Sequence, residues 1–213
     1  MAVELLNIDC MEYMRTLPDK VFDLAIVDPP YGIGENGQRN VTGDRPTAKW
    51  KNPKSQHYVT FDDSEIPTAE YWEQLFRVSK NQIVFGGNYF TEYLPPSKGW
   101  IVWDKQADIK EHLSMCELAW SSFDRKCNKF EYLWAGFKKK HQVERIHPTQ
   151  KPIDLYAWIL LHYAEPNQKL LDTHFGSGSI ALAVDRANRL DNMNLHLTAC
   201  EIDKEYIDKA IKR

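Results

Sequence analysis

Four consecutive residues, Asp28-Pro29-Pro30-Tyr31, bring together groups that could do chemistry. They follow the apolar run 22–27, which predicts a buried strand ending at residue 28. The two prolines end this strand, because neither can donate to a β ladder and each fixes its own φ. The result is a rigid turn that carries a carboxylate, a proline carbonyl and an aromatic ring. Such a group could accept both hydrogen bonds of a nucleobase amine while the ring stacks on the base.

A second candidate site is the segment 170–179, which predicts a strand, a glycine turn and the start of a helix. Gly176 and Gly178 permit a tight turn and close approach of a ligand, to which the helix start presents backbone N–H groups. Glu201 ends the next predicted strand, roughly 20 residues further on, as expected of an acid that binds ribose hydroxyls. The segment lacks both a full G-x-G-x-x-G and the G-K-[ST] of a P-loop. We therefore expect a cofactor that carries a nucleoside, rather than a dinucleotide or a hydrolysed ATP.

The elements that must position these residues alternate between strands and helices. Strands are predicted at 3–8, 22–28, 82–85, 100–103, 115–121, 132–135, 169–172 and 195–201, and helices at 11–17, 68–79, 153–164, 179–189 and 203–212. This alternation predicts an α/β, Rossmann-like fold with a mostly parallel sheet and helices on both faces. The strands between residues 100 and 135 have no helices between them, which predicts an antiparallel edge.

Size and composition are those of one globular α/β domain. The chain has 213 residues, 43% of them hydrophobic, and no apolar run approaches the ~20 residues that span a bilayer. The first residues do not resemble a signal peptide. The four cysteines, Cys10, Cys116, Cys127 and Cys200, are scattered without a C-x-x-C pair. We therefore expect a single cytoplasmic domain over residues 1–213, with no metal site and no membrane segment.

The charge distribution is compatible with a nucleic acid partner. The net charge is −3, but residues 38–58 and 125–145 are locally basic. Either segment could meet phosphates, although a run such as 138–140 is often only a solvated face. The predicted DNA contacts are Arg39, Arg45, Lys49, Lys51, Lys54, Lys138, Lys139 and Lys140. The regions 32–60 and 104–147 are thus candidate DNA-contacting insertions.

Asp28–Tyr31 followed by Phe175–Gly178 resembles the β class of the DNA amino-methyltransferases, which use S-adenosylmethionine. The segments 7–10, 85–88 and 147–152 are similar to further blocks of that family. The resemblance covers nearly the whole chain. It departs from the family pattern at Thr173 and His174, where proline and phenylalanine are common.

The resemblance implies a circularly permuted, seven-stranded sheet in which the last strand, 195–201, lies beside the first, 3–8. It also implies methyl transfer to N6 of an adenine that is flipped out of double-stranded DNA. Asp28 favours adenine, because relatives that act on cytosine N4 more often carry serine there. Homodimers occur in this class. Restriction–modification, phage self-protection and epigenetic control all stay open as biological settings.

The same resemblance assigns roles to individual residues. Asp28, Pro29, Pro30 and Tyr31 would be catalytic, with Asp28 and the Pro29 carbonyl accepting the amine hydrogens and Tyr31 stacking on the base. The implied cofactor-binding residues are Asp9, Cys10, Asp28, Thr149, Lys151, Pro152, Asp172, His174, Phe175, Gly176, Ser177, Gly178, Glu201 and Ile202.

Several alternatives stay open at this point. The substrate could be cytosine N4 or an RNA adenine, and the chain could be an inactive DNA-binding relative. A protein-glutamine methyltransferase usually has asparagine at the first motif position, so Asp28 argues against it. Asp9 is as well explained as a helix N-cap as by a cofactor contact. His147 and His174 are best interpreted as hydrogen-bonded structural histidines.

Overall fold

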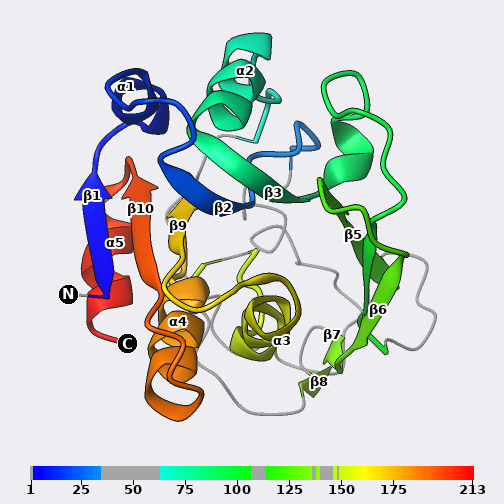
Figure 1. The fold of residues 1–213 in the computed structure, drawn as a ribbon. Helices are drawn as coiled ribbons and strands as arrows, with labels where there is room; N and C mark the ends of the chain where they lie inside the picture. Colours follow the sequence, from blue (N-terminus) through cyan, green and yellow to red (C-terminus); the bar gives the residue numbers. More distant parts are fainter. Residues whose placement is uncertain (1, 35–62, 107–113, 136–137, 140–145, 148) are drawn as a thin grey trace, which may run out of the picture.

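The structure, a computed structural model, describes residues 2–34, 63–106, 114–135, 138–139, 146–147 and 149–213. One sheet has the strand order β1-β10-β9-β2-β3-β5-β4-β6 (Figure 1). Its strands are β1 (Val3–Asn7), β2 (Phe22–Val27), β3 (Ser79–Phe85), β4 (Ile101–Asp104), β5 (Cys116–Ser121), β6 (Asn128–Glu131), β9 (Lys169–Asp172) and β10 (His196–Glu201). The five strands from β1 to β3 in this order are parallel, and β5 runs antiparallel to both β3 and β4. The predicted α/β class and antiparallel edge are confirmed.

The strand count corrects one prediction, because the sheet has eight strands instead of seven. The eighth is β6, which pairs in parallel with β4 at the sheet edge. Its sequence NKFE is only half-buried, so it lacks the apolar run that marks an inner strand. The strand predicted at 132–135 is found only at Trp134–Ala135 (β7). It pairs with Lys138–Lys139 (β8) in a separate two-stranded ribbon.

Helices cover both faces of the sheet (Figure 1). They are α1 (Cys10–Arg15), α2 (Ala69–Val78), α3 (Ile153–Tyr163), α4 (Ser179–Leu190) and α5 (Lys204–Ile211), with a short 3-10 helix η2 (Gly87–Tyr89) after β3. The first two pack together on one face, and α3, α4 and α5 lie on the other. None of the helices in the described ranges has the length and apolar character that a bilayer crossing requires.

The strand that precedes the Asp28 motif is buried on both sides. Leu24 and Ile26 of β2 belong to the core under α3 and α4, whereas Ala25 and Val27 belong to the core under α1 and α2. This double burial explains why β2 reads as an uninterrupted apolar run instead of an alternating one.

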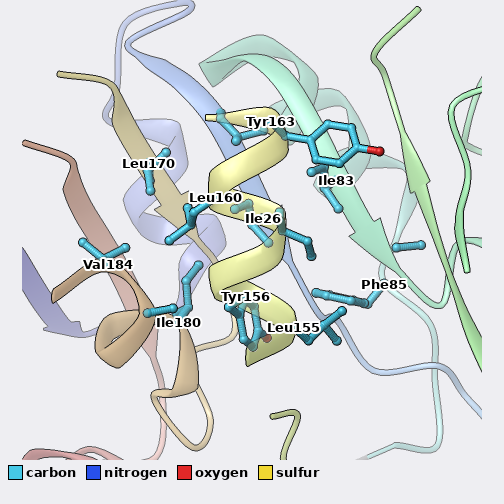
Figure 2. Packing of buried hydrophobic residues seen from close by; sticks show 14 of the residues in the cluster. Ile26, Ile83, Phe85, Leu155, Tyr156, Leu160, Tyr163, Leu170, Ile180 and Val184 are labelled. Carbon is cyan, nitrogen blue, oxygen red and sulfur yellow. The ribbon is translucent and has the colours of Figure 1, made fainter. Parts of the chain in front are cut away.

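The larger core surrounds α3. Figure 2 shows this helix between Ile180 and Val184 of α4 on one side and Ile83 and Phe85 of β3 on the other. Helix α3 is therefore fixed by apolar contacts to α4 and to β3. Lys151 lies two residues before its first turn.

The predicted adjacency of the first and last strands is confirmed. β1 and β10 are parallel neighbours, with Val3 opposite Leu197 and Asn7 opposite Glu201. The Asn7 side chain also donates to the carbonyls of Glu201 and Ile202, at 2.9 Å each. These bonds fix the backbone at the carboxyl end of β10, where Glu201 is placed.

Candidate active site

The two sequence motifs meet at one edge of the sheet. β10, β9 and β2 are consecutive parallel strands, so Glu201, Asp172 and the Asp28 motif lie at three neighbouring carboxyl ends. β2 and β9 pair directly, with Leu24 opposite Leu170. Ligands of open α/β sheets bind at this edge.

The Asp28 carboxylate has protein donors on both oxygens. Its Oδ1 accepts from the Tyr31 hydroxyl at 2.7 Å, and its Oδ2 accepts from Nζ of Lys151. The Lys151 ammonium is also 3.3 Å from the Tyr31 hydroxyl, and its side chain is only 3% exposed. A carboxylate offers about four acceptor positions, so Asp28 can still accept further hydrogens. Lys151, predicted to bind cofactor, therefore lies against the predicted catalytic residue.

Two further charged residues extend this cluster, and sequence reasoning missed both. Nζ of Lys151 is 3.7 Å from Oε2 of Glu117 in β5, and Nζ of Lys105 is 2.6 Å from Oε1 of Glu117. Burial alone would raise the pKa of the Glu117 carboxyl, but the two ammonium groups outweigh it and lower that pKa. An acid within the otherwise apolar strand CELAWS was the available signal for Glu117.

The Tyr31 ring is held by aromatic and glycine neighbours. It stacks on Tyr89 and meets Phe90 edge to face, with ring centroids 5.1 Å and 6.0 Å away. Gly86 has a φ of +66°, and a Cβ there would overlap the Tyr31 ring. Burial and the charge of Asp28 raise the pKa of the Tyr31 hydroxyl well above its usual value. Tyr31 is therefore a neutral donor to Asp28.

Asp63, which was not among the predicted site residues, holds the backbone of the Asp28–Tyr31 turn by hydrogen bonds. Its Oδ1 accepts from the backbone N–H groups of Tyr31 and Gly32, at 2.7 Å and 3.1 Å. Gly34 donates to the Asp63 carbonyl at 3.0 Å, so residues 34 and 63 adjoin. Asp63 is only 3% exposed. Its carboxylate therefore fixes the backbone on which Tyr31 stands.

The predicted glycine turn connects β9 to α4. Gly176 and Gly178 have φ values of +50° and +70°, which glycine adopts without strain. A Cβ at Gly178 would lie 2.9 Å from the Phe175 ring, so close packing also requires this glycine. At Gly176 the nearest atom to such a Cβ is 3.6 Å away, on His147. The backbone at Gly176 is therefore the more open of the two.

Two acids stand beside this turn. Glu201 accepts from the N–H of Gly176 at 2.8 Å and from the N–H of Asp203 at 2.9 Å, and burial raises its pKa. Asp172 is 2% exposed and accepts from the His174 N–H at 3.0 Å. Burial, with the nearby charges of Asp28 and Glu201, raises the pKa of Asp172 to about 8.

The two histidines of the site region are hydrogen-bonded within the fold, as predicted. Nδ1 of His174 is 2.9 Å from the Thr173 hydroxyl, and burial lowers the His174 pKa to about 4. Nδ1 of His147 is 3.0 Å from the Thr149 hydroxyl. Burial and the Lys151 charge lower the His147 pKa to about 3. Both imidazoles are therefore neutral near pH 7.

The remaining predicted cofactor residues have different surroundings. Asp9 is the N-cap of α1, accepting from the Met11 N–H at 2.6 Å, in agreement with the alternative interpretation. Cys10 starts that helix, and burial raises its pKa to about 12. Pro152 is buried before α3, Ser177 lies 3.1 Å from Ser179 through their hydroxyls, and Ile202 is 72% exposed.

Most of the predicted DNA contacts lie outside the described residues. Arg39, Arg45, Lys49, Lys51, Lys54 and Lys140 lie outside the described residues, and only the backbone of Lys138 and Lys139 is described. In the neighbouring segment Lys129 pairs with Glu131, and the Arg125 guanidinium lies 5.2 Å from the Tyr163 ring centroid. In the described part of the chain, no group of three or more His, Cys, Asp or Glu side chains is arranged to hold a metal ion.

Comparisons with known proteins agree with this arrangement. The family model for DNA methylases matches residues 103–212. A type II methyltransferase of Bacillus subtilis, M.BglII, is 25% identical over 248 aligned residues, which cover 96% of this chain. The chain spans 66% of the length of that relative.

Solved structures share the fold across almost the whole chain. M1.HpyAVI in complex with SAM has a TM-score of 0.57 at 19% identity, and the match covers 99% of both chains. The PvuII DNA methyltransferase, described as cytosine-N4-specific, has a TM-score of 0.62 at 12% identity. That match covers 99% of this chain and 86% of the PvuII chain.

Proposed function

We propose, because the chain belongs to the family of DNA methylases, that it transfers a methyl group from S-adenosylmethionine to an exocyclic amine of a base in DNA. One observation carries the proposal. The Asp28 motif and the glycine turn follow β2 and β9, which are hydrogen-bonded neighbours. An amine held by the first and a cofactor held by the second would therefore meet at one edge of the sheet.

The residues beside the glycine turn fit S-adenosylmethionine, with which M1.HpyAVI was crystallised. The open backbone at Gly176 allows close approach of a ligand, and Glu201 has acceptor positions left for ribose hydroxyls. When bound, the cofactor supplies an electrophilic methyl group and leaves as a neutral thioether. This cofactor site would be lined by Asp172, Phe175 and Gly178.

Asp28 acts on the exocyclic amine of the substrate. An exocyclic amine is a poor nucleophile, because its lone pair is delocalised into the ring. The Asp28 carboxylate and the Pro29 carbonyl accept its N–H bonds, which draws the nitrogen toward tetrahedral geometry and directs its lone pair at the methyl group. The methylated nitrogen then loses a proton, either to water or through Asp28. Most of the acceleration then comes from positioning and preorganised charge.

We propose adenine N6 as the acceptor. Relatives that act on cytosine N4 more often carry serine at the first motif position, where this chain has Asp28. The likeness to the cytosine-N4-specific PvuII enzyme makes cytosine N4 the second candidate. In either case the base has to leave the duplex, since its amine is otherwise out of reach.

The partner in this proposal is double-stranded DNA, bound through the regions 32–60 and 104–147. The setting is restriction–modification, because the relative M.BglII is a type II methyltransferase. The pairing of two copies stays a prediction.

The test is incubation of the purified chain with methyl-labelled S-adenosylmethionine and unmethylated genomic DNA, followed by nucleoside mass spectrometry. We expect N6-methyladenine, and we expect it to vanish in Asp28→Ala while cofactor binding stays normal. N4-methylcytosine would keep the mechanism and overturn the choice of base. No methylated deoxynucleoside despite cofactor binding would contradict the DNA substrate, and the same assay on RNA would then follow.

A further inference from the structure

Charged side chains form a line that runs from Asp28 into the sheet. Carboxylate and ammonium groups alternate in the order Asp28, Lys151, Glu117, Lys105. They come from four places in the chain: the residue after β2, the segment before α3, the second residue of β5 and the residue after β4. These four residues are distant in the sequence, and only the tertiary structure brings them together.

The middle of this line is well shielded from water. The Lys151 side chain is 3% exposed, and those of Lys105 and Glu117 are 17% and 25% exposed. Charges in such surroundings interact more strongly and are screened less by salt than surface pairs. A buried ammonium is costly unless it is paired, and Lys151 is paired on two sides. The Phe85 ring, with its centroid 4.7 Å from Nζ, adds a cation–π contact.

Asp28 has this ammonium as a partner. Nζ of Lys151 donates to its Oδ2, and the Tyr31 hydroxyl donates to its Oδ1, so a donor orients each oxygen. Without Lys151 in place, Oδ2 would lose the donor that orients it. The second carboxylate beside Lys151 is Glu117, whose Oε2 lies 3.7 Å from the ammonium.

We propose that Glu117 is a positioning residue: it holds the Lys151 ammonium in place against Asp28, so that the Asp28 carboxylate is oriented to accept from the substrate amine. The effect of Glu117 on turnover rests on the proposed function. The coupling between Glu117 and Lys151 does not, and it can be measured in the isolated protein.

The first measurement is NMR spectroscopy of the full chain labelled with ¹³C at lysine Cε, with the Lys151 signal assigned by its loss in Lys151→Arg. In Glu117→Gln the ammonium loses one of its two carboxylate partners, so we expect the Lys151 signal to shift and to broaden as the side chain leaves its position. Glu131→Gln is the matched control, because Glu131 pairs with the exposed Lys129 and should leave the Lys151 signal unchanged. A Lys151 signal that is the same in wild type and Glu117→Gln would overturn the proposal.

The second measurement is the steady-state kinetics of methyl transfer, because the split between kcat and KM separates positioning of Asp28 from substrate binding. We expect kcat of Glu117→Gln to fall about tenfold, with KM for both substrates within about twofold of wild type. Glu117→Asp should recover most of the loss, because it restores the carboxylate.

An unchanged kcat would overturn the role in turnover. A wild-type chain that methylates no nucleic acid would instead contradict the proposed function, and the NMR spectra would still decide the coupling.

Discussion

The ring of Tyr31 lies nearly parallel to the ring of Tyr89, with centroids 5.1 Å apart and an angle of 19° between the planes. Tyr89 is 42% exposed, so this pair reaches the surface beside Asp28. A base that stacks on Tyr31 must therefore meet the other face of its ring or take the place of Tyr89. In both cases the Tyr31 hydroxyl keeps its separate task as a donor to Asp28.

That division of tasks predicts the effect of Tyr31→Phe. The variant keeps the ring and loses the hydrogen bond to Asp28, and a bond to a charged group contributes about 1.5–3 kcal/mol. We expect kcat to fall about tenfold or more, with KM for DNA within about twofold of wild type. Steady-state kinetics checks this, and Tyr89→Phe is the control that should keep near-normal kcat. A raised KM with normal kcat would show that the hydroxyl binds DNA instead.

Gly86 and Gly34 form a matched pair for a second prediction. Both have a left-handed backbone, with φ values of +66° and +72°, so alanine strains either position by about 1 kcal/mol. Only at Gly86 would the new Cβ overlap the Tyr31 ring; at Gly34 nothing lies within 4 Å. We expect the backbone strain to lower the stability of both variants to urea, and the overlap to add a further loss of stability and at least a tenfold lower methylation rate in Gly86→Ala alone. Equal rates in the two variants would mean that the Tyr31 ring can shift without cost.

Asp63 should matter through its role as an acceptor. Asp63→Ala leaves the N–H groups of Tyr31 and Gly32 without the carboxylate, and we expect a loss of about 3 kcal/mol in the free energy of unfolding. Asp63→Asn keeps an oxygen in the same place and should cost about 1 kcal/mol. Urea denaturation measures both. If the two variants are equally unstable, the charge of Asp63 matters and its hydrogen bonds do not.

Asp172 makes stability depend on pH. Its pKa is raised in the folded protein from the ordinary 3.8 to about 8, so the folded state holds a proton that the unfolded state releases. The stability associated with this proton is present below about pH 4 and is lost as the pH rises through 8. We expect the Tm of Asp172→Asn relative to wild type to increase steadily from pH 5 to pH 9. A constant difference in Tm over that range would contradict the raised pKa.

The basic segments predict a steep salt dependence of DNA binding. Each phosphate contact releases counterions, so affinity falls with the logarithm of salt concentration. Replacing Lys138, Lys139 and Lys140 together with glutamine should reduce the slope of that plot by up to about 3. Fluorescence anisotropy with a duplex oligonucleotide gives the slope. A flat response in the wild type would remove both segments as phosphate contacts.

The sequence predicted those parts of the site that depend on a few consecutive residues. Two prolines after an apolar run place Asp28 at a strand end, and the two glycines after β9 mark the turn that starts α4. The resemblance to a known family added the adjacency of β1 and β10, which no local pattern contains. Asp9 caps a helix that the sequence itself predicts, and its contact with the cofactor stays a prediction.

The parts that escaped prediction depend on contacts between distant segments. Asp63 lies 32 residues after Tyr31, and its place at the turn follows from the meeting of residues 34 and 63. Lys151 contacts Asp28 across 123 residues, a contact that neither the local pattern nor the family resemblance predicted. Glu117 sits in a strand whose pairing with β3 and β4 decides which way its side chain points.

The pairing of β1 with β10 also bears on the order of folding. Among the described strands β1 pairs only with β10, and Val3 lies opposite Leu197, so β1 cannot enter the sheet until β10 has been synthesised. β2 and β3 can pair much earlier, at a smaller cost in loop-closure entropy. During synthesis, the strand that carries Asn7 therefore has to wait for its partner after the strand before Asp28 can already pair.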